Sequence, residues 1–178
     1  MGIPTFINSA TASNSATLSF TSGLDSTYSQ YMFIFNDIHP ETDSANFSFQ
    51  CSTDGGSNYN VTTTSDTFRN YHFESDSALD LAYDSSTDQE QGTGFQLLAE
   101  NFGSDNDQSG AGVLKLYTPS NTTFVKKYMA RCSRVSSNDN AYDFYVGGYF
   151  NTTSAIDAIQ FKMSSGNFNG YIQFYGIS

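Results

Sequence analysis

Tryptophan is absent from this sequence, and proline, histidine and cysteine are rare, with three, two and two copies in 178 residues. Only seven lysines and arginines face eighteen aspartates and glutamates, which gives a net charge of −11. So acidic a chain repels phosphate backbones and anionic lipid, which argues against nucleic-acid and membrane partners. No run approaches the roughly 20 apolar residues that cross a bilayer. No signal peptide is recognisable either, so we expect that the chain is made in a cytosol or is exported without a cleavable signal.

Aromatic residues, in contrast, are plentiful. Sixteen phenylalanines and twelve tyrosines make up 16% of the chain. Disordered segments are poor in aromatic residues and cannot bury enough surface to offset the entropy of ordering. Aromatic side chains pack well on the pleated surface of a sheet. The composition and length therefore predict one folded all-β domain over residues 1–178, with residues 1–15 as a candidate extended N-terminal arm.

Apolar and polar residues alternate along many short segments, as expected for half-buried strands. Helical periodicity is weak throughout, and Ser77–Tyr83 is the best place for one helical turn. The last two apolar segments flank SSGNFNG, so we expect them to form a terminal hairpin. The predicted strands, about nine or ten in number, are Ala16–Phe20, Tyr28–Ile38, Ala45–Cys51, Thr67–Phe73, Phe95–Ala99, Gly112–Tyr117, Phe124–Val135, Tyr142–Phe150, Ala158–Met163 and Tyr171–Ile177.

Many short strands separated by polar turns predict an antiparallel β-sandwich. A jelly roll is preferred, because the connections Asp54–Thr67 and Asp84–Thr93 are long for simple meanders. An immunoglobulin-like sandwich is the alternative, although the Cys, Trp, Cys arrangement that marks such domains is missing.

The cysteines and histidines offer no recognisable site. Cys51 and Cys132 each lie in a strand-like segment, where a free thiol behaves as a small buried hydrophobe. A disulfide between them is the less favoured alternative. His39 and His72 are not near a nucleophile signature. Without a cluster of Cys and His, an ordinary zinc site is excluded. We predict no catalytic, cofactor-binding or metal-binding residue and expect that the protein is not an enzyme.

Ser52–Tyr59 (STDGGSNY) is similar to an Asp-box hairpin. Asp54 can accept hydrogen bonds from backbone N–H groups across the turn, and Gly55 and Gly56 tolerate positive φ. We interpret this segment as a structural turn.

Two acidic segments suggest calcium. Asp105–Gly110 (DNDQSG) begins like an EF-hand loop, but Leu116 occupies the twelfth position, where a carboxylate is needed. Asp84, Asp88 and Glu90 form the second acidic group. Solvated loops are the preferred interpretation of both.

A glycosidase that uses two carboxylates stays open as an alternative. Glu41, Glu74, Glu90 and Glu100 are the residues to test for that role. The many tyrosines suit the core, but they also suit sugar stacking and protein contacts when they are exposed.

Three segments resemble small virion structural proteins of tailed bacteriophages, especially those of marine cyanobacteria. They are IHPETD at 38–43, QGTGFQLL at 91–98 and the closing NTTSAIDAIQFKMSSGNFNGYIQFYGIS. The resemblance extends over nearly the whole chain, its motifs are structural, and it implies no functional residues.

What the resemblance implies is a β-sandwich on the virion surface, assembled in the host cytoplasm. A head decoration or cement subunit is favoured, because no heptads or repeats indicate a fibre shaft. Its partners would be the major capsid protein or other virion proteins and further copies of itself, with a trimer favoured. The alternative is a tail-fibre or receptor-binding module that recognises a host glycan.

Overall fold

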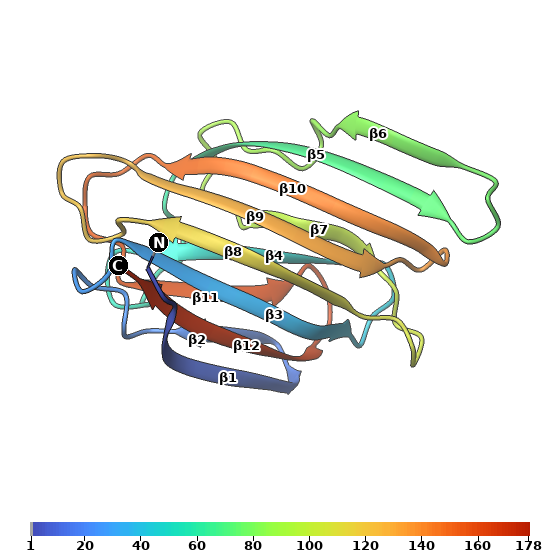
Figure 1. Cartoon of the computed structure of the whole chain (residues 1–178), viewed down its shortest axis with the longest axis horizontal. Helices are drawn as coiled ribbons and strands as arrows, with labels where there is room; N and C mark the ends of the chain where they lie inside the picture. Colours follow the sequence, from blue (N-terminus) through green and yellow to red (C-terminus); the bar gives the residue numbers. More distant parts are fainter. Residues whose placement is uncertain (1) are drawn as a thin grey trace.

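The computed structural model describes residues 2–178, which form two antiparallel sheets packed face to face (Figure 1). The large sheet contains, in spatial order, β1 (Thr5–Ser15), β12 (Phe168–Ile177), β3 (Gln30–Pro40), β8 (Gly110–Tyr117), β9 (Lys126–Val135), β10 (Asn140–Phe150), β5 (Thr63–Phe73) and β6 (Leu79–Tyr83). The small sheet contains β2 (Thr17–Phe20), β11 (Ala158–Met163), β4 (Ala45–Ser52) and β7 (Gln96–Phe102). The predicted all-β sandwich is confirmed.

Eight of the twelve strands have the connectivity of a jelly roll. They are ordered β1-β12-β3-β8 in the large sheet and β2-β11-β4-β7 in the small one. Numbered one to eight along the chain, these orders are 1-8-3-6 and 2-7-4-5. Successive strands therefore alternate between the sheets, except that β4 and β7 are neighbours in the small sheet. The remaining strands, β9, β10, β5 and β6, continue the large sheet beyond β8. We call these four strands the extension.

All ten predicted strands are present, but the predicted number was too low, because β1 and β6 were missed. The candidate arm contains β1, an edge strand of the large sheet whose side chains are mostly exposed. The helical turn predicted over Ser77–Tyr83 was wrong, because Leu79–Tyr83 is strand β6, paired with β5. Leu79, Leu81 and Tyr83 recur every second residue, which is the period of a strand.

The predicted terminal hairpin was also wrong. Strand β11 pairs with β2 and β4 in the small sheet, whereas β12 pairs with β1 and β3 in the large sheet. Residues 164–167 therefore cross from one sheet to the other. The N–H of Ser164 donates to the carbonyl of Asn46, and the N–H of Glu41 donates to the carbonyl of Asn167, so the crossing segment binds other loops.

Aromatic rings fill the space between the sheets. Phe33 on β3 stacks on Phe174 of β12, with ring centroids 4.6 Å apart, and contacts Phe161 of the small sheet at 5.7 Å. Cys51 and Cys132 are buried free thiols, as predicted. Burial raises the pKa of both thiols, that of Cys132 to about 12, so neither is a reactive nucleophile.

Candidate binding face

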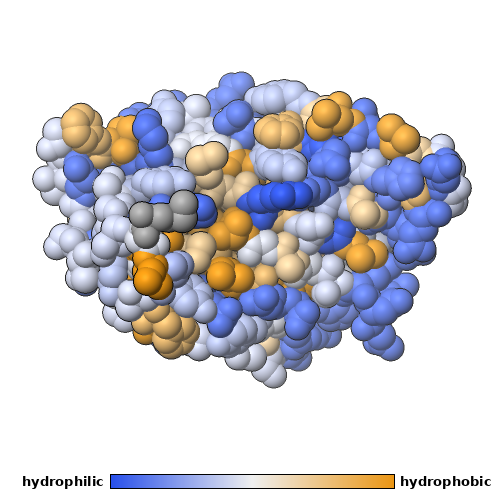
Figure 2. All heavy atoms as spheres, viewed as in Figure 1, coloured by the Kyte–Doolittle hydropathy of each residue, from blue (hydrophilic) through white to orange (hydrophobic). Residues whose placement is uncertain are grey.

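The outer face of the large sheet carries alternate side chains of β9. Tyr128, Ala130 and Cys132 point into the core, while Met129 and Arg131 point outward. Met129 is 59% exposed although it is a large apolar residue. Figure 2 views this face and shows hydrophobic side chains in its middle and along its upper rim, among hydrophilic ones. Apolar surface in such a position marks a candidate contact site.

Met129 lies at the centre of a shallow groove. Three adjoining hollows of about 390, 210 and 340 Å³ are all lined by Met129. Asp66, Tyr117, Tyr145 and Gly147 contribute the walls and floor, and we call these five residues the Met129 groove. Gly147 lies opposite Met129 on β9 and Asp66 on β5. Since it has no side chain, it leaves the floor of the groove open between its two neighbours.

Aromatic and charged groups line up beside the groove. Tyr145 stacks on Phe68 with ring centroids 4.7 Å apart and an interplanar angle of 3°. The guanidinium carbon of Arg131 lies 5.0 Å from the Tyr145 ring centroid, and its Nε donates to both carboxylate oxygens of Asp143 at 3.1 and 3.0 Å. The hydrogen bond to Asp143 raises the pKa of Arg131. The result is a stacked pair of aromatic rings with a fixed cation beside it.

Positive charge is concentrated on this face. Lys115, Lys127 and Arg131 all belong to outward-facing positions of β8 and β9; Lys127 lines one hollow of the groove, and Lys115 and Arg131 line the adjoining one. They are three of only seven basic residues in a chain of net charge −11. The outer face of β8 and β9 is therefore less acidic than the rest of the protein.

The rim of the extension exposes further apolar side chains. Leu79, Leu81 and Tyr83 of β6 are 72%, 71% and 60% exposed. Tyr83 lies opposite Phe68 on β5, so the three side chains share the outer face with Phe68. We call strand β6, with these three side chains, the β6 edge. It is an unpaired sheet edge at the rim of the molecule (Figure 1).

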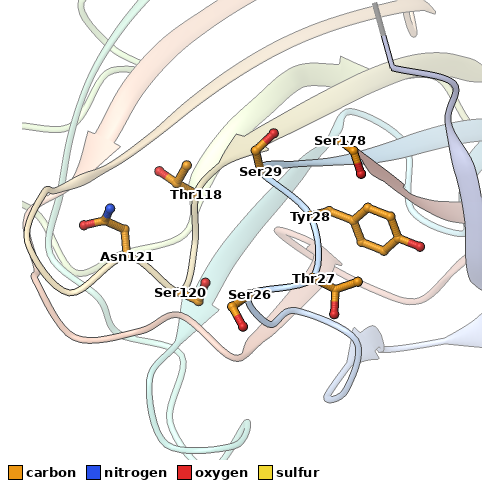
Figure 3. Close-up of a pocket in the computed structure, with 8 residues that line it drawn as sticks. All are labelled: Ser26, Thr27, Tyr28, Ser29, Thr118, Ser120, Asn121 and Ser178. Atoms are coloured by element: carbon orange, nitrogen blue, oxygen red, sulfur yellow. The ribbon is translucent and has the colours of Figure 1, made fainter.

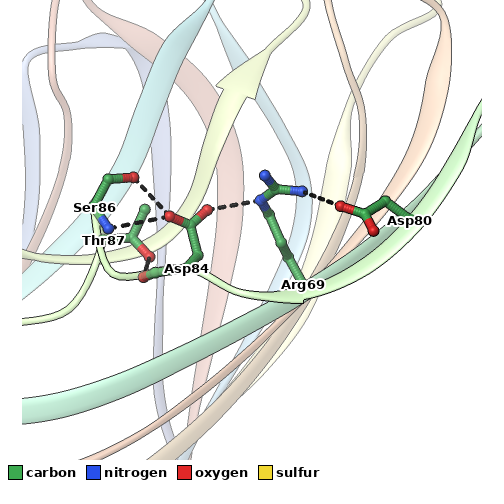
Figure 4. A network of polar contacts seen from close by, with 5 residues as sticks. All are labelled: Arg69, Asp80, Asp84, Ser86 and Thr87. Atoms are coloured by element: carbon green, nitrogen blue, oxygen red, sulfur yellow. Dashed lines mark hydrogen bonds and ion pairs between the residues drawn. The ribbon is translucent and has the colours of Figure 1, made fainter.

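The inner face of β5 and β6 carries a network of ion pairs and hydrogen bonds. The Nε of Arg69 donates to a carboxylate oxygen of Asp84 at 2.7 Å, and Asp80 lies 3.8 Å from the same guanidinium (Figure 4). Burial raises the pKa of Asp84, but hydrogen bonds from Ser86 and Arg69 outweigh it, so the pKa lies below its usual value. Asp84, a member of the second acidic group, is therefore an ion-pair partner.

Arg134 is buried beside this network, and none of its three guanidinium nitrogens donates a hydrogen bond to any residue in 2–178. Its guanidinium carbon lies 4.1 Å from the centroid of the Tyr142 ring. Burial lowers the pKa of Arg134 to about 10. Burial and the charge of Asp84 raise the pKa of Glu100, which is partly offset by Arg69 and Arg134. Glu100 is the only one of the four glutamates proposed for catalysis that is half-buried; the others are exposed in loops.

The remaining acidic candidates have structural partners. Asp54 accepts hydrogen bonds from Ser52 and from the backbone and side chain of Asn58, which lower its pKa to about 2. With Gly55 and Gly56 at positive φ, this segment is the structural turn that was predicted. Asp88 accepts a hydrogen bond from the Tyr83 hydroxyl, and Glu90 is exposed.

The loop over 105–110 is closed by its own glutamine. The Oε1 of Gln108 accepts a hydrogen bond from the backbone of Asp105, and its Nε2 donates to Asp139. The carbonyl of Gln108 lies 2.7 Å from His39 Nδ1, and His72 lies beside Asp76 at 3.0 Å. Among residues 2–178, no three His, Cys, Asp or Glu side chains come together as a metal would require.

A second hollow, of about 440 Å³, lies between the loops that precede β3 and follow β8 (Figure 3). Its lining is polar and consists of Ser26, Thr27, Tyr28, Ser29, Thr118, Ser120, Asn121 and Ser178. These hydroxyl and amide groups provide hydrogen bonds but no acid, base or nucleophile activated by a neighbour.

The Met129 groove could only partly be found from the sequence. The alternation over Phe124–Val135 places Lys127, Met129 and Arg131 on one face, but it does not say that this face is open. Gly147 and Gly148, within an otherwise aromatic strand, were the available signal, because glycine inside a strand leaves space beside the backbone.

No protein-family model matches this chain, and no curated protein matches it significantly. Among residues 2–178, no helix is long and apolar enough to cross a membrane.

Proposed function

We propose that this protein is a structural virion protein of a tailed bacteriophage, a decoration or cement subunit on the head. One observation carries the proposal: large apolar side chains are gathered on the outer face of the extension. Among residues 2–178, eight large apolar side chains are exposed, and five of them lie there, namely Phe68, Leu79, Leu81, Tyr83 and Met129. Exposed apolar surface concentrated on one face is typical of a site covered by another protein.

The resemblance of 38–43, 91–98 and 151–178 to phage virion proteins supports the same function. In this role the jelly roll provides stability, and the outer face contacts the major capsid protein, other virion proteins or further copies of the chain. The trimer expected from the resemblance, the virion-surface location and the absence of enzymatic activity stay predictions.

Labelling intact particles tests this proposal. An antibody raised against the purified protein, detected by electron microscopy on virions, is expected to decorate the head. Label confined to the tail would reject the head location, and particles without any label would reject the virion proposal itself.

Recognition of a host glycan is the second candidate, and the Met129 groove favours it. Sugar rings pack on aromatic faces, and the groove places Tyr117 and Tyr145 beside Lys115 and Lys127. This combination suits an acidic polysaccharide, because cations pair with its carboxylates.

A glycan array with and without calcium tests this candidate. Binding is expected to fall at least about fivefold in Tyr145→Ala, if the ring contributes roughly the 1 kcal/mol at the lower end of the range for bases stacked on aromatic side chains. Tyr175→Ala, on the outer face of β12 outside the groove, is the matched control and should bind normally. No binding of acidic polysaccharides under either condition would eliminate the candidate.

A further inference from the structure

The hydrogen bonds of β6 leave one set of backbone groups free. The N–H of Asp84 donates to Thr67 on β5, and the N–H of Phe73 donates to the carbonyl of Ala78. Backbone groups alternate between the two edges of a strand. Since residues 78 and 84 bond toward β5, residues 80 and 82 do so as well, and residues 79, 81 and 83 turn their N–H and C=O groups outward.

The same three residues carry the exposed apolar side chains. Leu79, Leu81 and Tyr83 are each at least 60% exposed. An unpaired edge with apolar side chains is a template for another strand, and soluble proteins commonly guard it with charges or proline. Strand β6 has neither at residues 79, 81 and 83.

We infer that the β6 edge pairs with the β6 edge of a second copy of this chain, antiparallel, about a two-fold axis at Leu81. In this register Leu81 faces Leu81 of the second copy, and Leu79 faces its Tyr83. All three outward-facing residues of each copy then exchange backbone hydrogen bonds. Two large sheets would join into one, with the apolar side chains of both edges adjacent on the outer face.

The charge of Asp80 on β6 selects this register. Asp80 is the only charged residue of the strand, and it lies on the inner face beside Arg69. Pairing centred on Leu81 places Asp80 opposite Ala82 of the second copy. A slip of two residues in one direction would place Asp80 opposite Asp80, and a slip in the other direction would place it opposite Asp84. Like charges directly opposite are destabilising, so the strand is complementary to itself only in the register proposed.

This inference deepens the proposed structural function, because it names one partner of the exposed face. A two-fold contact closes at two copies. It can therefore join two single chains or link two trimers, but it does not itself form a trimer. Pairing of the β6 edges is tested on the purified protein and is therefore independent of particle labelling. Lack of pairing would contradict only the β6 contact, whereas lack of label on virions would contradict only the phage function.

Cysteine cross-linking tests the register directly. The two native cysteines are buried and do not compete. Under mild oxidation Leu81→Cys is expected to form a disulfide-linked dimer, because Cα atoms that face each other across an antiparallel pair are about 5.5 Å apart, within disulfide range. Leu79→Cys is the matched control: two copies of residue 79 would lie about 13 Å apart, so its dimer yield should be at least about tenfold lower.

A mixture of Leu79→Cys and Tyr83→Cys chains is expected to give the mixed dimer in preference to either homodimer. Adding Leu81→Pro to both chains should abolish that mixed dimer, because proline removes an outward N–H without breaking a bond to β5. Circular dichroism of the proline variant checks that the fold is retained. Equal cross-linking of Leu79→Cys and Leu81→Cys, or a mixed dimer that survives Leu81→Pro, would overturn the inference.

Discussion

In both the jelly-roll half of the large sheet and the extension, side chains alternate between an inner and an outer face. The two regions differ in what covers the inner face. In the jelly-roll half, the small sheet covers inward phenylalanines such as Phe33 and Phe174, which are fully buried. Across the extension, the inward residues change from Phe144 on β10 to Arg69 on β5 and exposed Asp80 on β6. Alternation of apolar and polar residues identifies the strands. Whether a strand contributes to the stability of the fold or to contacts with other molecules depends on the presence of an opposing sheet.

The loop after β6 replaces the small sheet as the inner cover of β5. Gln96, the first residue of β7 after this loop, is buried, accepts a hydrogen bond from Ser65 of β5 at 2.6 Å and donates to the carbonyl of Thr87 in the loop. Asp84 holds Arg69 from the same loop. Hydrogen bonds and the ion pair with Arg69 hold this loop on β5. We therefore expect the stability of this region to depend on pH more strongly than that of the aromatic core.

The largest effect is expected in the aromatic core. Phe33→Ala should lower the free energy of unfolding by about 3–5 kcal/mol, because it removes a fully buried ring and leaves a cavity. Phe68→Ala, on the outer face of the extension, is the matched control and should cost about 1 kcal/mol or less. Urea titration followed by circular dichroism measures both; equal losses would mean that the extension is part of the core.

A smaller loss is expected for the ion pair of the extension. Asp84→Asn should cost roughly 2 kcal/mol near pH 7, because it leaves Arg69 half-buried without its partner. Asp80→Asn, which removes a more exposed charge, should change stability by less than about 0.5 kcal/mol.

The same variant defines a pH window. The folded-state pKa of Asp84 lies below its ordinary value of 3.8. The contribution of Asp84 to stability is therefore present above pH 4 and lost as the pH falls through the folded pKa. Unfolding free energies of the parent protein and Asp84→Asn should converge as the pH falls below 4 and through the folded-state pKa of Asp84. A difference that stays constant over this range would contradict the ion pair.

Arg134→Met is expected to raise the stability, by up to about 2 kcal/mol, because it replaces a buried cation without hydrogen-bond partners by an apolar side chain. The change should appear as a higher urea midpoint with an unchanged slope. A loss of stability would show that the guanidinium has a partner in solution, and Glu100→Gln would then identify whether that partner is Glu100.

The smallest effect on folding is expected at the β6 edge. Leu81→Ser should change the unfolding free energy of the isolated chain by less than about 0.5 kcal/mol, since the side chain is exposed. It should nevertheless weaken self-association in sedimentation velocity at high protein concentration. Leu24→Ser, at a buried position of the jelly roll, provides the contrast and should destabilise the fold.

Much of this fold could be predicted from the sequence, because its strands bury one face and expose the other. The segment Phe124–Val135 illustrates this, with Tyr128 and Cys132 directed into the core and Met129 and Arg131 directed outward. Strand β1 could not be predicted, because most of its side chains are polar and exposed, so its pairing depends on the backbone of β12. The crossing after β11 depends on which strands lie adjacent in space, and no local pattern contains that information.

The candidate binding face was less predictable. A strand pattern shows that Met129 and Tyr145 point away from the core, but not that a groove lies between them. Leu79, Leu81 and Tyr83 were assigned to a helical turn, and the free edge that they form depends on the ladder with β5.

Residue-resolved hydrogen exchange of the β6 amides tests the central claim, that the extension acts through its exposed edge, most directly. In dilute protein, the amides of Leu79, Leu81 and Tyr83 should exchange rapidly, while those of Asp80 and Ala82, bonded to β5, are protected. At high concentration the three rapid amides should become protected as copies pair. Rapid exchange of these three amides at every concentration, or slow exchange of all five in dilute protein, would contradict the account.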